Sequence, residues 1–185
     1  MDGSDPDYPA VARLGAYNRE SSMSIVLRDF APEDFETLWR IDQQCFPPDI
    51  AYARAELLHY INQRSSFSIV AEVDGAIEGF LVAEASKRRK AGHVITIDVQ
   101  EQFRRHQIGT LLMSECEKRL VASGCDAVFL ETAVNNADAI AFYRRHGYRV
   151  LETLPCYYHG ELDALLMGKK LPKQSQPRIF TDSHG

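Results

Sequence analysis

The sequence predicts an α/β domain in which helices flank a single mixed sheet. Runs with apolar residues at every second position alternate with runs at helical spacing, in the order β-α-α-β-β-β-α-β-α-β-β. The pair Asp74-Gly75 separates two strand-like runs and is typical of a two-residue hairpin turn. The clearest helix, Ile108 to Ser123, ends at Gly124, and its apolar face is expected to carry Leu111, Leu112, Cys116 and Leu120.

The first part of the domain is predicted to contain a strand and two helices. Ser24 to Phe30 alternates apolar and polar side chains, as a short strand does. Pro32, followed by two acidic residues, is a favourable helix start, and Phe46-Pro47-Pro48 ends that helix because proline lacks the amide that a helix interior needs. A second helix is expected from Arg54 to Gln63.

The rest of the domain is predicted to contain six strands and a last helix. Asn136 is expected to cap this helix, and Gly147 to close it. The strands are expected at Phe67 to Val73, Ala76 to Ala85, His93 to Val99, Ala127 to Thr132, Tyr148 to Leu154 and Asp163 to Lys170. The fold would therefore occupy residues 23–171, between a flexible leader at 1–22 and a flexible tail at 172–185.

The composition is that of a soluble globular protein. The 185 residues are 45% hydrophobic and 25% charged, which excludes a disordered or fibrous chain. The four cysteines include no C-x-x-C pair, so they favour a reducing compartment and are interpreted as small core residues. No run approaches about 18 apolar residues, and Met1 to Asp7 is acidic, so we expect a cytoplasmic protein with no membrane partner.

The formal net charge of -5 argues against nucleic acid as a partner, but the charge is unevenly distributed. Residues 1–85 hold 6 basic against 15 acidic side chains, whereas residues 86–185 hold 15 basic against 11 acidic ones. The two halves are therefore expected to meet different partners, an anion at the second half and a cation near Asp49 in the first.

A basic turn lies between the strand that ends at Val99 and the helix that begins near Ile108. It contains Gln102-Phe103-Arg104-Arg105-His106-Gln107-Ile108-Gly109-Thr110. Free amides and the positive end of a helix dipole meet at such a position, which suits an anionic phosphate. Taken alone, the turn is more typical of a solvated basic loop that caps a helix.

A second run follows the next strand, Asn136-x-x-Ala139-Ile140-x-x-Tyr143-x-x-x-Gly147-Tyr148. It resembles the second signature of the GNAT acyltransferase superfamily, and the basic turn resembles the acetyl-CoA pyrophosphate loop of that family. The resemblance covers the chain from about Met23 to Leu171. It implies a sheet splayed between its fourth and fifth strands, with the pantetheine arm of acetyl-CoA in the gap.

The resemblance implies acetyl-CoA as the cofactor. The residues expected to bind it are Ile97, Asp98, Val99, Arg104, Arg105, His106, Gln107, Ile108, Gly109, Thr110, Asn136, Ala139 and Tyr143. The basic residues Lys87 to Lys90 are expected to help with its ribose phosphate. Gln107 departs from the family pattern, which usually has glycine there, and its side chain would crowd the pyrophosphate or oppose a positive φ angle.

Acetyl transfer to an amine requires a neutral amine, a polarised carbonyl and a proton for the departing thiolate. The resemblance implies that Glu131 is the general base, with a strand-end salt bridge as the alternative. It implies that Tyr143 protonates the leaving sulfur, with a core tyrosine as the alternative. A bulge where Asp98 and Val99 end the fourth strand is implied to offer a backbone amide to the thioester oxygen.

Two further stretches, Phe46 to Tyr52 and Tyr157 to Met167, are similar to N-terminal acetyltransferases, including the ribosomal-protein-alanine class. The residues implied to wall a slot for the substrate are Phe46, Pro47, Tyr52, Glu131, Tyr157 and Tyr158. An α-amino group, with a pKa of about 7.7–8.0, needs less help to become neutral than a lysine at about 10.4. The leading hypothesis is direct acetylation, in a ternary complex, of the α-amine of a protein or peptide, with a ribosomal protein as one candidate.

Two alternatives stay open. GNAT folds change substrate by loop variation, so a small amine such as a polyamine or a drug is a second acceptor class. The unusual Gln107 keeps a third interpretation open, a sensor that binds the cofactor without catalysis. The six histidines lack the spacing of a metal site, and the chain is expected to be a monomer or a homodimer.

Overall fold

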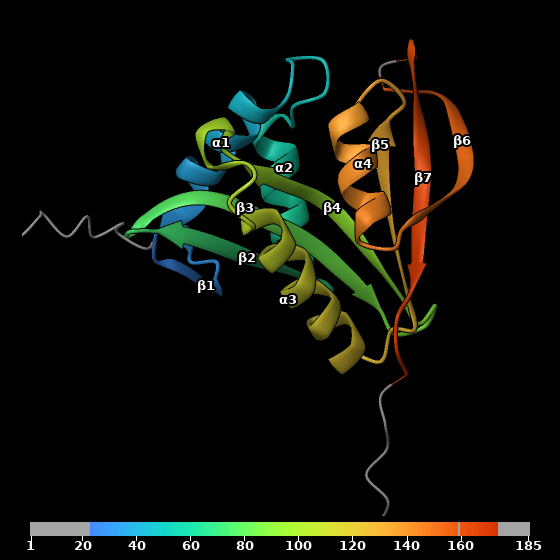
Figure 1. Ribbon diagram of the computed structural model, residues 1–185, viewed down its shortest axis with the longest axis horizontal. Coiled ribbons are helices and arrows are strands. Elements are labelled where there is room, and N and C mark those ends of the chain that lie inside the picture. Colours follow the sequence, from blue (N-terminus) through green and yellow to red (C-terminus); the bar gives the residue numbers. More distant parts are fainter. Residues whose placement is uncertain (1–22, 159, 174–185) are drawn as a thin grey trace, which may run out of the picture.

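A computed structural model describes residues 23–158 and 160–173. Its seven strands form one mixed sheet in the order β1-β2-β3-β4-β5-β7-β6, and helices lie on both faces (Figure 1). The strands are β1 (Ile25–Asp29), β2 (Ser66–Val73), β3 (Ala76–Ser86), β4 (Ala91–Val99), β5 (Ala127–Ala133), β6 (Arg149–Tyr158) and β7 (Leu162–Lys170). The predicted α/β class with a single mixed sheet is confirmed. The predicted leader and all but the first two residues of the predicted tail lie outside the described residues.

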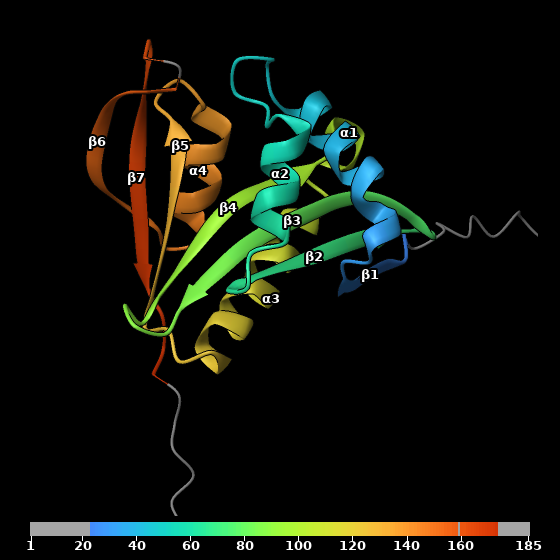
Figure 2. The same cartoon turned by 180° about the vertical axis from the view of Figure 1, so that it is seen from behind.

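Two apolar layers hold the helices to the sheet. Helix α3 (Ile108–Ala122) covers one face, where Leu112, Cys116 and Leu120 are fully buried against the strands. Helices α1 (Phe35–Cys45) and α2 (Arg54–Ile61) cover the other face through Leu38 and Leu57, as the view from behind shows (Figure 2). Helix α4 (Ala137–Arg145) packs beside β5. Burial of these apolar stripes, at about 25 cal/mol per Å², is the main force that joins helices to sheet.

Strands β4 and β5 are parallel and separate soon after they meet. Their register contains three pairs, from Ala91 with Ala127 to His93 with Phe129. Beyond His93 the two strands diverge, and backbone groups of β4 face a gap instead of a neighbouring strand. The predicted splay between the fourth and fifth strands is therefore confirmed.

A β-bulge changes the face on which the second half of β4 presents its side chains. Val94 pairs with Ala83 and Thr96 with Val82, so Ile95 is the extra residue. Beyond the bulge, Ile97 packs in the apolar layer between α3 and the sheet. Asp98 lies close enough to Asp42, a residue of α1, for the two carboxyl groups to repel each other. The predicted bulge of the fourth strand is present, but its predicted position at Asp98 and Val99 is wrong, because Val99 pairs in register with Gly79.

Two further predictions are wrong. Leu111 is 38% exposed, since the face of α3 that meets the sheet contains Leu112 and Met113 instead. The basic residues Lys87 to Lys90 form the β3–β4 turn, at the opposite end of β4 from Val99. The nine residues of β4, roughly 26 Å of strand, separate this turn from the basic turn before α3, so Lys87 to Lys90 lie far from that basic turn. Among the described residues, no helix is long and apolar enough to cross a membrane.

Candidate active site

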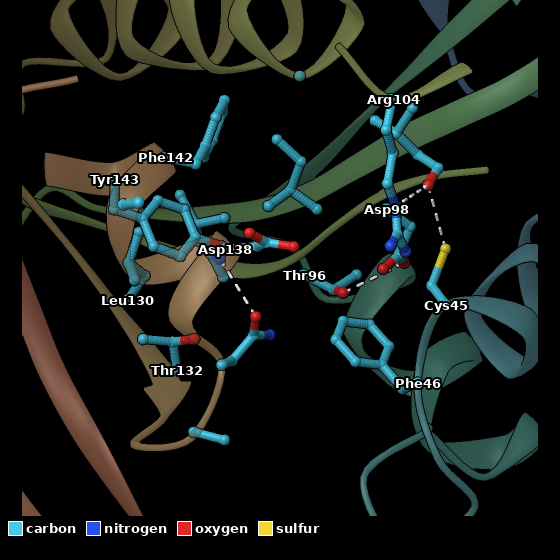
Figure 3. Close-up of a pocket in the computed structure, with 18 of the residues that line it drawn as sticks. Cys45, Phe46, Thr96, Asp98, Arg104, Leu130, Thr132, Asp138, Phe142 and Tyr143 are labelled. Carbon is cyan, nitrogen blue, oxygen red and sulfur yellow. Dashed lines mark hydrogen bonds between the residues drawn. The ribbon is translucent and has the colours of Figure 1, made fainter. Parts of the chain in front are cut away.

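A cavity of about 740 Å³ occupies the gap between β4 and β5. Its walls are formed by Val94 to Val99 of β4 and by Leu130 to Ala133 of β5. The α1–α2 segment closes it on one side and the first turns of α3 and α4 on the other. Figure 3 shows Cys45, Phe46 and Asp98 on one wall and Leu130, Phe142 and Tyr143 on the opposite wall. The splay of the sheet is thus the direct cause of the cavity.

One end of the cavity meets the N-terminus of α3. Arg104, Arg105, Gly109 and Thr110 line it there. The first hydrogen bond of the helix runs from the amide of Leu111 to the carbonyl of Gln107, at 2.9 Å, so the amides before it have no partner inside the helix. Free amides, a helix dipole and two guanidinium groups form a donor set that suits the phosphates of coenzyme A.

Gln107 adopts the left-handed conformation that the family's glycine would adopt, with φ 66° and ψ 0°. Arg105, two residues earlier, also has φ 66°. A side chain therefore does not prevent the positive φ angle, although it costs roughly 1–2 kcal/mol in this region. Gly109 has a different role, because a Cβ atom there would lie 3.2 Å from the Phe142 ring. The absence of a side chain lets α3 pack closely on α4.

Helix α4 presents Tyr143 to the cavity. The Oδ1 atom of Asn136 accepts a hydrogen bond from the amide of Ala139 at 3.1 Å, which confirms its predicted capping role. Tyr143 is 8% exposed and its ring packs edge-on against Phe142, with centroids 5.4 Å apart. Burial, and then the nearby charge of Asp98, raises the pKa of the Tyr143 hydroxyl. The phenol therefore keeps its proton at neutral pH and can act as a proton donor.

Glu131 lies on the β5 wall and is held by a histidine that the sequence analysis considered only as a metal ligand. The Nε2 atom of His93 lies 2.6 Å from Oε2 of Glu131, and its Nδ1 atom lies 3.9 Å from Oε1 of Glu84. Because a carboxylate only accepts, Nε2 carries the hydrogen of this bond. This bond fixes one carboxylate oxygen of Glu131, and the other oxygen makes no hydrogen bond to His93. The side chain of Glu131 lines the cavity.

The acceptor side of the cavity is formed by Phe46, Tyr52 and Tyr158. The hydroxyl of Tyr52 donates to the carbonyl of the bulge residue Ile95 at 3.2 Å, so it holds the bulge in place. Burial raises the pKa of Tyr158 to about 12. Val99 ends the strand with its carbonyl accepting from Arg104 Nε at 3.1 Å.

Most of the predicted site residues come together in this cavity, but four do not line it. His106 is bonded to the carbonyl of Arg104, and Ile108 is 1% exposed in the core. Pro47 is exposed, and Tyr157 is 49% exposed beside Tyr158. The lining residues that the sequence analysis missed include Cys45, Thr96, Thr132, Asp138, Phe142 and Arg145. Of the cysteines, Cys116 and Cys125 are buried core residues as predicted, whereas Cys45 is half-buried and Cys156 exposed.

The sequence profile of the acetyltransferase (GNAT) family matches residues 35–148. The chain therefore belongs to the GNAT acetyltransferase family. An uncharacterized N-acetyltransferase of Methanocaldococcus jannaschii is 31% identical over 158 residues, which cover 85% of this chain and 99% of that protein. An N-alpha-acetyltransferase of Sulfurisphaera tokodaii is 28% identical over 156 residues, covering 78% of this chain and 92% of its own.

Solved structures show the same fold. Ard1 from Thermoplasma volcanium superposes with a TM-score of 0.74 at 28% identity, covering 80% of this chain and 99% of its own. A putative streptothricin acetyltransferase from Bacillus anthracis, in complex with acetyl coenzyme A, superposes with a TM-score of 0.65 at 18% identity, covering 80% and 100%. The chain is an N-acetyltransferase, and its predicted cofactor, acetyl-CoA, is confirmed by this family membership. The described residues contain no cluster of three or more potential metal ligands.

Proposed function

We propose that this protein transfers an acetyl group from acetyl-CoA to the α-amine of a protein or peptide N-terminus. The observation that carries the proposal is Glu131, a carboxylate that lines the cavity and is oriented by His93 at 2.6 Å. The relatives named N-alpha-acetyltransferase support the same acceptor class. An α-amine, with a pKa of about 7.7–8.0, suits a single carboxylate base, because little free energy is needed to neutralise it.

The cofactor-binding residues are proposed to be those of the α3 end and of β4. The amides at the N-terminus of α3, with Arg104 and Arg105, would hold the pyrophosphate. Backbone groups of β4 from Ile97 to Val99 face the gap toward β5 and would orient the pantetheine arm, while Asn136 and Ala139 line the opposite wall. His106 and Ile108 would contribute through their backbone, because their side chains do not line the cavity.

Bound acetyl-CoA supplies a thioester whose carbonyl carbon accepts the amine. Glu131, directly or through a water molecule, takes a proton from the acceptor nitrogen. Tyr143 gives the proton of its hydroxyl to the departing sulfur, and its raised pKa keeps that proton in place until then. Phe46, Tyr52 and Tyr158 exclude water from the acceptor side, and Pro47 and Tyr157 would contact the substrate at the rim.

A set of matched acceptors tests the proposal. Peptides with a free α-amine, the same peptides with a blocked N-terminus and an internal lysine, and a polyamine are each incubated with acetyl-CoA, and release of the free CoA thiol is followed. Release with the free α-amine alone supports the proposal. Release with the polyamine alone overturns it in favour of a small-amine acetyltransferase, and cofactor binding without release favours a sensor.

A further inference from the structure

The wall of the cavity under Phe46 contains a carboxyl group that neither the cofactor nor the proposed base uses. Asp98 lines the cavity and is 1% exposed, and Thr96 donates to its Oδ2 atom at 3.2 Å. Its Oδ1 atom is buried and has no hydrogen-bond partner among the described residues. In Figure 3 this carboxyl group lies between Thr96, Phe46 and Cys45. A buried polar atom without a partner is unfavourable, so this oxygen favours a ligand that can donate to it.

A second buried carboxyl group lies behind the first. Asp42 of α1 is fully buried, and its negative charge acts on Asp98. Its Oδ2 atom accepts from the amide of Tyr52 at 2.9 Å, but its Oδ1 atom has no hydrogen-bond partner in the part of the chain that the structure describes. Glu56 of α2 adds a further negative charge near Asp42. Two buried carboxyl groups from β4 and α1 thus repel each other, and Asp98 is the one of the two that lines the cavity.

The positive charge at this position is small. Among the described residues, Arg104 is the cationic side chain that acts on the pKa of Asp98 and lowers it. Its Nε atom already donates a hydrogen bond to the carbonyl of Val99. A neutral donor would satisfy Asp98 but would leave the repulsion between Asp98 and Asp42. A cationic donor would satisfy the free oxygen and favour the ionised form of Asp98, which burial and the charge of Asp42 disfavour in the empty site, so an ammonium or guanidinium group fits this position.

The position of Asp98 relative to the reacting groups sets the reach of that cation. Asp98 lies on the wall opposite Leu130 and Tyr143 (Figure 3), so the cation must extend across the cavity from the amine that is acetylated. The side chains of lysine and arginine are long and flexible enough, whereas serine and threonine are short. We propose that Asp98, backed by Asp42, is a specificity-determining residue that selects an acceptor with a second positive charge, a lysine or arginine as its first residue. This inference rests on the proposed acetylation of N-termini.

Two peptides that differ only in the first residue test the inference. One begins with lysine and the other with norleucine, which has a similar length but no ammonium group, and neither contains another lysine. The ratio of kcat/KM for α-amine acetylation is measured, with the acetylated nitrogen identified by fragmentation mass spectrometry. We expect the lysine peptide to be favoured at least about tenfold. Its ammonium group can make a charge-assisted hydrogen bond to Asp98, about twice as strong as a neutral one, whereas norleucine can make none.

The variant Asp98→Asn keeps the shape of the side chain and removes its charge. We expect the lysine preference to fall below about threefold. Because the ratio is taken within each variant, a general loss of rate cancels. Asp138→Asn is the matched control, since Asp138 is another carboxyl group that lines the cavity, on α4, and it should retain the preference. If Asp98→Asn does not fold, as judged by thermal unfolding, Asp98→Ser replaces it.

Each outcome decides the inference. Equal rates for the lysine and norleucine peptides in the wild type overturn it and leave the proposed function standing. A lysine preference that survives in the folded Asp98 variants also overturns it. A second pair of peptides begins with threonine or valine. A preference for threonine over valine, without one for lysine over norleucine, assigns Asp98 to a neutral donor and refutes the cationic acceptor. Acetylation of none of these peptides overturns both the inference and the proposed function.

Discussion

His93 and Glu131 join β4 to β5 at the point where the two strands begin to separate. His93 belongs to the last register pair of the parallel ladder, and its Nε2 atom lies 2.6 Å from Glu131 Oε2, two residues beyond its strand partner Phe129. The side-chain bond thus continues the contact between the strands by one step after the backbone ladder ends. The proposed general base, Glu131, therefore lies on rigid strands at the point where they separate, which favours a fixed orientation of its carboxylate.

Glu131→Gln removes the proposed base while it keeps the size of the side chain. We expect kcat to fall roughly 10²- to 10⁴-fold, because this is the range of general base catalysis, with little change in the KM for acetyl-CoA. Steady-state kinetics with an N-terminal peptide measure both constants. Glu84→Gln is the control, since Glu84 lies 3.9 Å from the other side of His93 and does not line the cavity. A Glu131→Gln enzyme with wild-type kcat would show that Glu131 is a structural residue.

His93 acts through Glu131, so its variant should depend on that residue. We expect His93→Asn to lower kcat about tenfold, because the shorter side chain no longer orients the carboxylate. In the double variant with Glu131→Gln, the second substitution should cost almost nothing further, since residues that act as a unit are not additive. Additive losses in this double-mutant cycle would indicate that His93 has a separate role.

Tyr143→Phe removes the proposed proton donor and leaves the aromatic packing in place. We expect kcat to fall by about 10²-fold or more, while the melting temperature changes little. Tyr148→Phe provides the matched control, because Tyr148 is also buried but donates its hydroxyl to Glu117 Oε1 at 3.2 Å, outside the cavity. This control should lose about 1 kcal/mol of stability and keep its kcat. If Tyr143→Phe lost stability and kept its kcat, Tyr143 would be a structural core residue.

The order of elements was predictable from the sequence because it depends on local patterns. The hairpin around Asp74-Gly75 and the Asn136 cap are set by residues within a few positions of each other, and both are present in the structure. The family signatures added the splay and the cavity walls. Leu111 was misplaced because the sequence shows an apolar face but not how far the sheet extends under it.

The polar contacts inside the site were not predictable in the same way. His93 and Glu131 are 38 residues apart, and their contact depends on the register of two parallel strands. The bulge at Ile95 is set by pairing with β3, and no side chain of β4 marks it. Asp42 is a buried residue of α1, and only the packing of this helix on the sheet brings its charge close to Asp98. A histidine and a glutamate at the ends of neighbouring strands would be the signal to look for.

The conformation of Gln107 leads to a prediction for the phosphate loop. Gln107→Gly should retain or slightly strengthen acetyl-CoA binding, because glycine adopts a φ of 66° without steric cost. Gln107→Val should weaken binding about tenfold, since a β-branched residue is a genuine outlier in the left-handed region. Calorimetric titration with acetyl-CoA measures both. Lys118→Val, at an exposed position of α3, is the control for a β-branched residue in the same segment and should bind as the wild type does.

Asp42 makes stability depend on pH. Burial raises its pKa from 3.8 to about 6, so the folded state holds a proton that the unfolded state has already released between these values. The free energy of unfolding therefore falls as pH rises through this window, by about 2 kcal/mol between pH 4.5 and 7.5. Asp98 contributes in the same direction, because burial also raises its pKa. Asp34 acts in the opposite direction, since Arg28 lowers its pKa, but its effect lies below this window.

Asp42→Asn should remove the contribution of Asp42 to this dependence and leave that of Asp98. The amide oxygen can still accept from the amide of Tyr52, and the amide group carries no charge to desolvate. We expect the variant to be more stable than the wild type at pH 7.5 and about equal to it at pH 4.5, by denaturant unfolding at both values. If wild-type stability changed between pH 4.5 and 7.5 in the same way as that of Asp42→Asn, Asp42 would be ionised throughout, with its charge balanced by a group other than those described.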